Sequence, residues 1–188
     1  ALKDIDVAYY LIHSLSNDNY KDLDKISAQN FLDIANLCGV KKIIYLGGLG
    51  VKDKNTSEHL LSRIETGEIL SSNKNVQTIW FRAGVIIGSG SASFEIIRNL
   101  TEKLPIMTTP KWVNTKAQPI AVSDVLSYLH NGLYLEKREN LIVDIGSEQL
   151  SYKNMMLKTA KVLGLKRILI TLPFMSINLS SYWLNLFT

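Results

Sequence analysis

The sequence is poor in the features that mark secreted, membrane-spanning and nucleic-acid-binding proteins. It has one cysteine, Cys38, among 188 residues, which excludes an internal disulfide framework and favours a reducing compartment. No apolar run approaches the ~18 residues of a membrane span, and residues 1–15 lack the basic flank and cleavage site of a secretory signal. The net charge is +4, but the lysines are interleaved with acidic residues and form no basic run that alternates with aromatics. We therefore expect a cytoplasmic protein that does not bind nucleic acid.

Short apolar runs alternate along the chain with segments of helical periodicity. The runs are nearly continuous, which is typical of strands buried on both faces of a parallel sheet. Strand and helix alternate about every 20 to 30 residues, which predicts an α/β fold: a doubly wound parallel, Rossmann-like sheet with right-handed crossovers. The expected strands are residues 6–12, 41–48, 76–88, 118–122, 140–146 and 167–172.

Five segments have the period and the end signals of helices. Ser57, Ser123 and Ser151 precede helices as expected caps, and Gly164 ends the last one. The segment from Leu104 to Ala117 interrupts the pattern and is expected to be a loop or short hairpin. The expected helices are residues 22–38, 58–70, 92–104, 123–135 and 151–165. In the first of them Leu23, Ile26, Phe31, Ile34, Ala35 and Cys38 recur near a 3.6-residue period, so we expect this face, including the thiol, to be buried.

The carboxyl ends of three expected strands supply candidate binding residues. Ligands of open α/β sheets bind beyond these ends, so the ends should converge on a crevice. Each end could instead be a structural turn, and Arg82, which closes an apolar strand, could form a buried salt bridge. The candidates are His13, Ser14, Gly47, Gly48, Leu49, Arg82, Ala83, Gly84 and Val85.

Glycine turns give a weaker signal. A dinucleotide site needs a glycine turn between a first strand and a helix, and no G-x-G-x-x-G occurs here. The glycines at residues 47–50 open a loop, whereas the turn made of Gly88, Ser89, Gly90 and Ser91 opens a helix. That second turn could form an anion nest for a phosphate or substrate, or could be a plain glycine turn.

The helix expected at residues 58–70 carries the candidate chemistry. Leu60, Ile64 and Gly67 form its core-facing stripe, and a glycine inside a helix predicts close packing on a neighbour. His59 and Arg63 border that stripe. A histidine can exchange a proton near neutral pH, and an adjacent arginine would favour its neutral form. The alternative is a pair of polar residues on a helix edge.

Five segments, in this order and at these intervals, resemble the later part of extended or atypical short-chain dehydrogenases/reductases. The similarity is to epimerase-like and NmrA-like NAD(P)-binding proteins, and it covers nearly the whole chain. The segments are residues 6–15, 41–50, 59–70, 81–91 and 118–125.

The resemblance implies a position for each part of the chain in the family's fold. Residues 6–12 would be the fourth strand, so three strands and the Gly-rich pyrophosphate loop are expected upstream of Ala1. Residues 1–115 would be the C-terminal part of an NAD(P)-binding domain, and residues 116–188 a substrate-side subdomain with a C-terminal helix. We expect NAD or NADP as cofactor and no metal.

The family's catalytic residues are replaced in this chain. Its tyrosine and lysine, spaced Y-x-x-x-K, fall on His59 and Arg63, so the resemblance implies an acid/base role for the first and a ribose contact for the second. Its serine falls near residues 47–49, where there is no hydroxyl, and its proline and tyrosine after Arg82 are also absent.

Three functions are compatible with the sequence. The first is an NAD(P)-binding oxidoreductase or epimerase-like enzyme acting on a small carbonyl or sugar-nucleotide-like substrate. The second is a non-catalytic dinucleotide sensor or scaffold. The third is a membrane-surface protein, which rests only on an expected amphipathic helix after Pro173. An exposed sheet edge or apolar helix face could also support a homo-oligomer.

Overall fold

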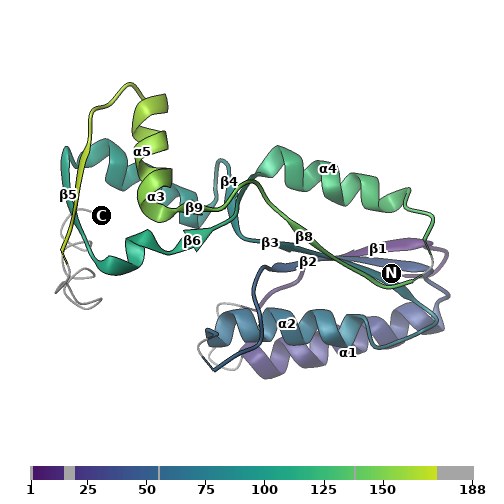
Figure 1. The fold of residues 1–188 in the computed structure, drawn as a ribbon. Helices are drawn as coiled ribbons and strands as arrows, with labels where there is room; N and C mark the ends of the chain where they lie inside the picture. The colour runs from purple at the N-terminus through teal and green to yellow at the C-terminus, as the bar shows by residue number, and fades with distance from the viewer. Residues whose placement is uncertain (1, 15–19, 55, 138, 173–188) are drawn as a thin grey trace. The chain divides into compact units, whose positions relative to one another are not determined.

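The computed structural model describes residues 2–14, 20–54, 56–137 and 139–172, which form two compact units (Figure 1). The first unit contains the described residues up to Gly84 together with Ser123–Ile145. The second contains Val85–Val122 and the described residues from Gly146 onward. The chain therefore passes between the units after Gly84, Val122 and Ile145, whereas the sequence-based division placed one boundary after residue 115.

A four-stranded parallel sheet forms the centre of the first unit. Its strands are β1 (Val7–Tyr10), β2 (Lys42–Gly48), β3 (Gln77–Ala83) and β8 (Leu141–Ile145), in the order β1-β2-β3-β8. All three neighbouring pairs are parallel. Parallel strands place their carboxyl ends at one edge of the sheet, so the ends of β1, β2 and β3 do lie together.

Helices cover both faces of this sheet. α1 (Tyr20–Leu37) and α2 (Glu58–Leu70) lie on one face, and α4 (Val122–Leu133) lies on the other (Figure 1). The predicted doubly wound parallel fold is thus confirmed. Gly67 also packs as expected, because a Cβ there would lie 2.5 Å from ring atoms of Trp80.

A buried lysine holds the end of α4 against the sheet. The ammonium of Lys42 donates to the carbonyl oxygens of Gly132, Leu133 and Leu135 at 3.1, 2.9 and 2.8 Å. These carbonyls end a helix, where a positive charge is favourable. Burial lowers the pKa of Lys42, and its carbonyl partners replace the water that it has lost.

The buried face of α1 differs from the predicted one. Ala35 is buried as predicted, together with Ala28, Leu32 and Asp24, which were not predicted. The expected core residues Leu23, Ile26 and Ile34 are exposed. Cys38 lies just beyond the helix and is exposed, so the prediction of a core thiol is wrong. Two neighbouring stripes of α1 have helical spacing, and the one with small alanines is the one that packs closely.

The second unit consists of short pairings around two helices. β4 (Val85–Ile87) pairs parallel with β7 (Pro119–Ala121), and β6 (Lys116–Ala117) pairs antiparallel with β9 (Leu150–Ser151). β5 (Ile106–Thr109) pairs parallel with β10 (Ile168–Thr171). The remaining elements are α3 (Ala92–Lys103), a 3-10 helix (Lys111–Asn114) and α5 (Tyr152–Val162).

Three local predictions about this part of the chain are wrong. The apolar run at residues 76–88 is two strands, because β3 and β4 pair in different sheets on either side of Gly84. Residues 104–117 are not a loop or hairpin, because β5 finds its partner about sixty residues later. Ser123 is not a cap, since α4 begins one residue earlier. By contrast, Ser57 and Ser151 cap α2 and α5 as predicted. The Ser57 hydroxyl accepts a hydrogen bond from Leu60 N, and the Ser151 hydroxyl accepts one from Asn154 N.

Within the described residues, no helix combines the length and apolar character needed to cross a membrane. The amphipathic helix expected after Pro173 lies outside those residues.

Candidate functional site

Asp24 is the centre of a polar cluster in the first unit. The residue is 3% exposed, and its carboxylate accepts hydrogen bonds from His13 Nδ1, Ser14 N and Ser62 Oγ, each at 3.0 Å. These donors come from the segment after β1 and from α2, whereas Asp24 itself is on α1. One carboxylate therefore ties three segments together near the carboxyl end of β1.

The surroundings of Asp24 keep it ionised. Burial by itself would raise the pKa of this carboxyl, but the hydrogen bonds from Ser62 and Ser14 and the nearby His13 outweigh burial and lower the pKa. Because an ionised carboxylate can only accept hydrogen bonds, the proton between Asp24 and His13 belongs to His13 Nδ1.

His59 lies beside His13. The two ring centroids are 4.7 Å apart and the rings are tilted by 37°. Burial is the largest cause that lowers the pKa of His59; Arg63 and His13 lower it further, and Asp24 opposes them. His59 is therefore a neutral imidazole at neutral pH, as the sequence led us to expect from its neighbour Arg63.

Arg63 is half-buried one turn along α2 from His59. Its carbonyl oxygen accepts a hydrogen bond from Tyr45 Oη at 2.9 Å, and its side chain passes close to Gly48 at the end of β2. Arg63 Nε and His13 Nε2 are both buried and have no hydrogen-bond partner among the described residues. Buried polar atoms normally have partners, so these two nitrogens could receive a ligand that presents oxygen atoms.

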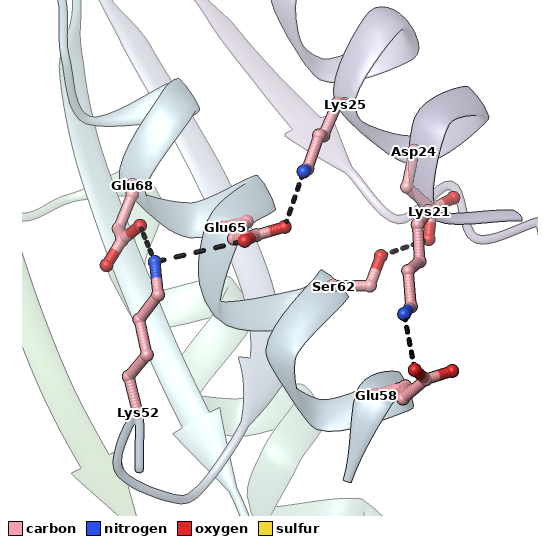
Figure 2. Close-up of polar contacts among 8 residues, drawn as sticks. All are labelled: Lys21, Asp24, Lys25, Lys52, Glu58, Ser62, Glu65 and Glu68. Atoms are coloured by element: carbon pink, nitrogen blue, oxygen red, sulfur yellow. Dashed lines mark hydrogen bonds and ion pairs between the residues drawn. The ribbon is translucent and has the colours of Figure 1, made fainter. Parts of the chain in front are cut away.

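Ion pairs on the outer side of α2 join it to α1, through Lys21 and Lys25, and to the loop after β2, through Lys52. Figure 2 shows them flanking the buried hydrogen bond from Ser62 to Asp24. The pairs are Lys21–Glu58 at 2.8 Å, Lys25–Glu65 at 3.1 Å and Lys52–Glu68 at 3.1 Å. Exposed pairs of this kind contribute at most about 1 kcal/mol each, so the register of the two helices depends mainly on their buried contacts.

The glycines at the end of β2 are explained by packing. A Cβ on Gly47 would collide with the indole nitrogen of Trp80, and one on Gly48 would lie 2.6 Å from Leu60 Cδ1. Gly50 is equally close to Leu60, at 2.5 Å. A serine at these positions would displace α2 or Trp80, which gives a steric reason for the missing hydroxyl.

Arg82 forms a salt bridge, as its alternative interpretation proposed, but the pair is partly exposed rather than buried. It binds Asp144 on the adjacent strand through Nε at 2.6 Å and Nη2 at 3.0 Å, and its side chain is 24% exposed. The guanidinium carbon also lies 5.7 Å from the Trp80 ring centroid. Leu49 N bonds the carbonyl of Ala83 at 2.8 Å. Arg82 Nη1 also donates to the carbonyl oxygen of Gly50 at 3.4 Å. The described contacts of Arg82 thus link β3 to β8 and to the loop after β2, and they do not include the two histidines.

The turn at Gly88–Ser91 is in the second unit, as is Val85. A Cβ on Gly88 would lie 2.6 Å from Val122, and Gly90 has φ +80°, which glycine adopts readily. Ser91 precedes α3, but its hydroxyl donates to the carbonyl of Ile86 rather than capping the helix. These contacts explain the turn structurally, and its role with phosphate or substrate stays a prediction.

Sequence reasoning missed Asp24 and Ser62. The signal for Asp24 was its position four residues before Ala28, on the stripe that continues through Leu32 and Ala35. A carboxylate on a stripe of small apolar residues indicates a buried acceptor. Although the cluster has two histidines and a carboxylate, no group of three or more His, Cys, Asp or Glu in the described part of the chain could hold a metal ion.

Comparisons with known proteins agree with this architecture. No protein-family model and no curated protein matches the sequence. Solved structures do match: UDP-N-acetylglucosamine 4-epimerase from Bacillus cereus has 15% identity and a TM-score of 0.72, over 98% of this chain and 72% of that one. MoeE5, determined with UDP-glucose and NAD, has 15% identity and a TM-score of 0.71, over 92% of this chain and 67% of the MoeE5 chain.

A third similar structure is TunA, an NAD-dependent NDP-hexosamine 5,6-dehydratase of tunicamycin biosynthesis. It has 13% identity and a TM-score of 0.69, over 92% of this chain and 65% of that one. This chain thus spans about two thirds of the length of these structures. Over that length its fold is similar to the fold of these epimerase and dehydratase structures, in agreement with the fold that the resemblance implied.

Proposed function

We propose that the protein binds NAD or NADP and is an oxidoreductase or epimerase-like enzyme for a small carbonyl or sugar-nucleotide-like substrate. The observation that carries this proposal is the grouping of His59, Arg63 and His13 at one edge of the parallel sheet. The similar structures support it, because several contain NAD and bind sugar nucleotides. A homo-oligomer stays a prediction.

The residues in the first unit fit part of such a cofactor. Arg63 Nε is a buried donor without a partner in the described residues, and it suits a ribose hydroxyl. Because Gly48 has no side chain, it leaves the backbone at the end of β2 accessible to the cofactor. When bound, the nicotinamide would supply the hydride acceptor or donor.

His59 would carry the proton. As a neutral imidazole it can accept the proton of a substrate hydroxyl while the attached carbon is oxidised, and it returns that proton in the reverse direction. Arg63 stays charged throughout and makes the His59 imidazolium a stronger acid, which favours return of the proton.

The test is cofactor binding and turnover by the full-length protein. We expect NAD or NADP to bind by calorimetry, and one of a panel of carbonyls and sugar nucleotides to turn over. Turnover would be measured as a net change in NAD(P)H absorbance or, because an epimerase returns the hydride to its substrate, as formation of the epimerised sugar nucleotide. His59→Gln should lower kcat about 100-fold or more with cofactor affinity retained. The matched control is His130→Gln, at an exposed histidine of α4, which should leave kcat unchanged. Absence of cofactor binding by the wild-type protein would refute the proposal.

A second function, a non-catalytic dinucleotide sensor or scaffold, is favoured by the packing of Gly47 and Gly48. The steric contacts with Trp80 and Leu60 leave no room for the family's serine hydroxyl. Tight cofactor binding with no turnover on the same panel, in the wild type and in His59→Gln alike, would support this second function over the first.

A further inference from the structure

We propose that Asp24 and His13 form a second proton-carrying pair, in which Asp24 is a positioning residue that acts through His13 to receive the proton of His59. This inference rests on the proposed function, and it extends the site to two groups that nothing in the family resemblance assigns to proton transfer.

The hydrogen bonds of Asp24 determine which nitrogen of His13 is protonated. Oδ1 accepts from Ser14 N, and Oδ2 accepts from both His13 Nδ1 and Ser62 Oγ. Because the ionised Asp24 carboxylate can only accept, His13 must present N–H at Nδ1, and its Nε2 keeps a lone pair in the neutral ring. Asp24 is 3% exposed and is held from three sides, so it cannot turn to let the ring reverse.

The lone pair of His13 Nε2 belongs to the ring beside the His59 ring, which must pass on the proton that it takes from the substrate. His13 Nε2 is buried without a hydrogen-bond partner in the part of the chain that the structure describes. The centroid of the His59 ring is 4.7 Å from that of His13. Because His13 Nε2 has no hydrogen-bond partner among the described residues, the proton passes between the rings through one bridging water molecule.

The proton step balances within the two rings. His59 takes the proton of the substrate hydroxyl and becomes an imidazolium; its N–H bond then breaks as an N–H bond forms at His13 Nε2. The positive charge moves from a ring next to Arg63 to a ring hydrogen-bonded to the Asp24 carboxylate. Both neighbours favour this direction, because Arg63 repels the charge and Asp24 attracts it.

The decisive variant is Asp24→Asn. Its amide has the shape of the carboxylate, but its N–H₂ group donates, so His13 Nδ1 must accept and the ring must carry its proton on Nε2. We expect kcat to fall 10²- to 10⁴-fold, as when a histidine is held in the wrong tautomer, while KM changes much less. In ¹⁵N NMR spectra, His13 should change from the Nδ1–H form in the wild type to the Nε2–H form in Asp24→Asn.

The matched control is Ser62→Ala, which removes one neutral donor from the same carboxylate and leaves its charge. We expect His13 to stay in the Nδ1–H form and kcat to fall less than about tenfold. If Asp24→Asn does not fold, His13→Asn serves instead: its amide N–H can still donate to Asp24, but it cannot carry a proton, so kcat should fall as in Asp24→Asn.

The NMR measurement separates this inference from the proposed function. If no substrate turns over, the proposed function fails, yet the wild-type tautomer still tests the dyad. An Nε2–H form of His13 in the wild type would overturn the inference, and so would a full kcat in Asp24→Asn or His13→Asn.

Discussion

The two units of this protein differ in what their interiors contain. The first unit holds both of the buried charged side chains found among the described residues, Asp24 and Lys42. The second unit has a cavity of about 300 Å³ between α3, β5, the 3-10 helix and α5, and none of its described lining residues is charged. Met107, Trp112 and Met156 are among them.

This difference teaches where polar chemistry can occur. A buried carboxylate is costly unless it is fully hydrogen-bonded, and the first unit meets that cost with three donors around one side chain. The cavity of the second unit is lined mostly by apolar side chains and therefore suits apolar groups. Polar substitutions should therefore dominate the stability of the first unit and changes of apolar volume that of the second.

The largest effect is expected for Asp24→Leu, which replaces the carboxylate by an apolar group of similar size. His13, Ser14 and Ser62 would each lose their acceptor while they stay buried or half-buried. We expect the free energy of unfolding to fall by about 4 kcal/mol in urea titrations, since buried donors without partners cost ~1–3 kcal/mol each. Asp33→Leu, at an exposed position on the same helix, should change it by less than about 0.5 kcal/mol. A neutral Asp24→Leu would mean that the carboxylate does not hold the three segments together.

The matching change in the second unit is Met156→Ala, which enlarges the apolar cavity. Met156 is 5% exposed, and truncation of a buried methionine costs ~2–5 kcal/mol, so we expect a loss of about 3 kcal/mol in the same titration. The control is Leu157→Ala, at the next residue of α5, which is 37% exposed and should cost about 1 kcal/mol. Equal losses for the two variants would show that the cavity wall is not a packed core.

A third change tests the steric limit of the first unit. Gly67→Ala would place a methyl group 2.5 Å from the Trp80 ring, and we expect a loss of about 2 kcal/mol despite the better helix propensity of alanine. Gly132→Ala in α4 is a graded control, because its Cβ would lie 3.2 Å from Ile44 and Phe81 and should cost less. A stabilising Gly67→Ala would show that α2 can move away from the sheet.

The smallest effect is a pH dependence confined to the first unit. Burial and Arg63 lower the folded pKa of His59 below its ordinary value of 6.5, so the stability it contributes is present above pH 6.5. As pH falls from 6.5 toward the folded pKa, the unfolded chain binds the proton first and stability decreases. Asp24, whose pKa is also lowered, adds a second loss below its ordinary value of 3.8.

Melting temperatures measured between pH 8 and pH 5 check this prediction. The wild type should lose stability below pH 6.5, and His59→Asn should lose less over the same interval. An identical profile in both proteins would contradict a lowered pKa at His59. His130→Asn, in which an exposed histidine is replaced, should keep the wild-type profile.

The order of strands and helices could be predicted from the sequence because it depends on local signals. Continuous apolar runs, serine caps at Ser57 and Ser151, and a glycine inside α2 each report on a few neighbouring residues. They were sufficient for the parallel doubly wound sheet and for the position of His59 and Arg63 beside the core-facing stripe of their helix, whereas the position of that helix at the site was implied by the family resemblance.

The remaining features depend on residues that are distant in the chain. Only the tertiary structure decided which stripe of α1 is buried, because both stripes have the same period and only the contact with the sheet distinguishes them. It also decided that the chain leaves the first unit at Gly84, and that β5 pairs with β10. Asp24 is hydrogen-bonded to His13 and Ser62, which are 49 residues apart in the sequence. These hydrogen bonds form only when the chain has folded, so no local sequence pattern predicts them.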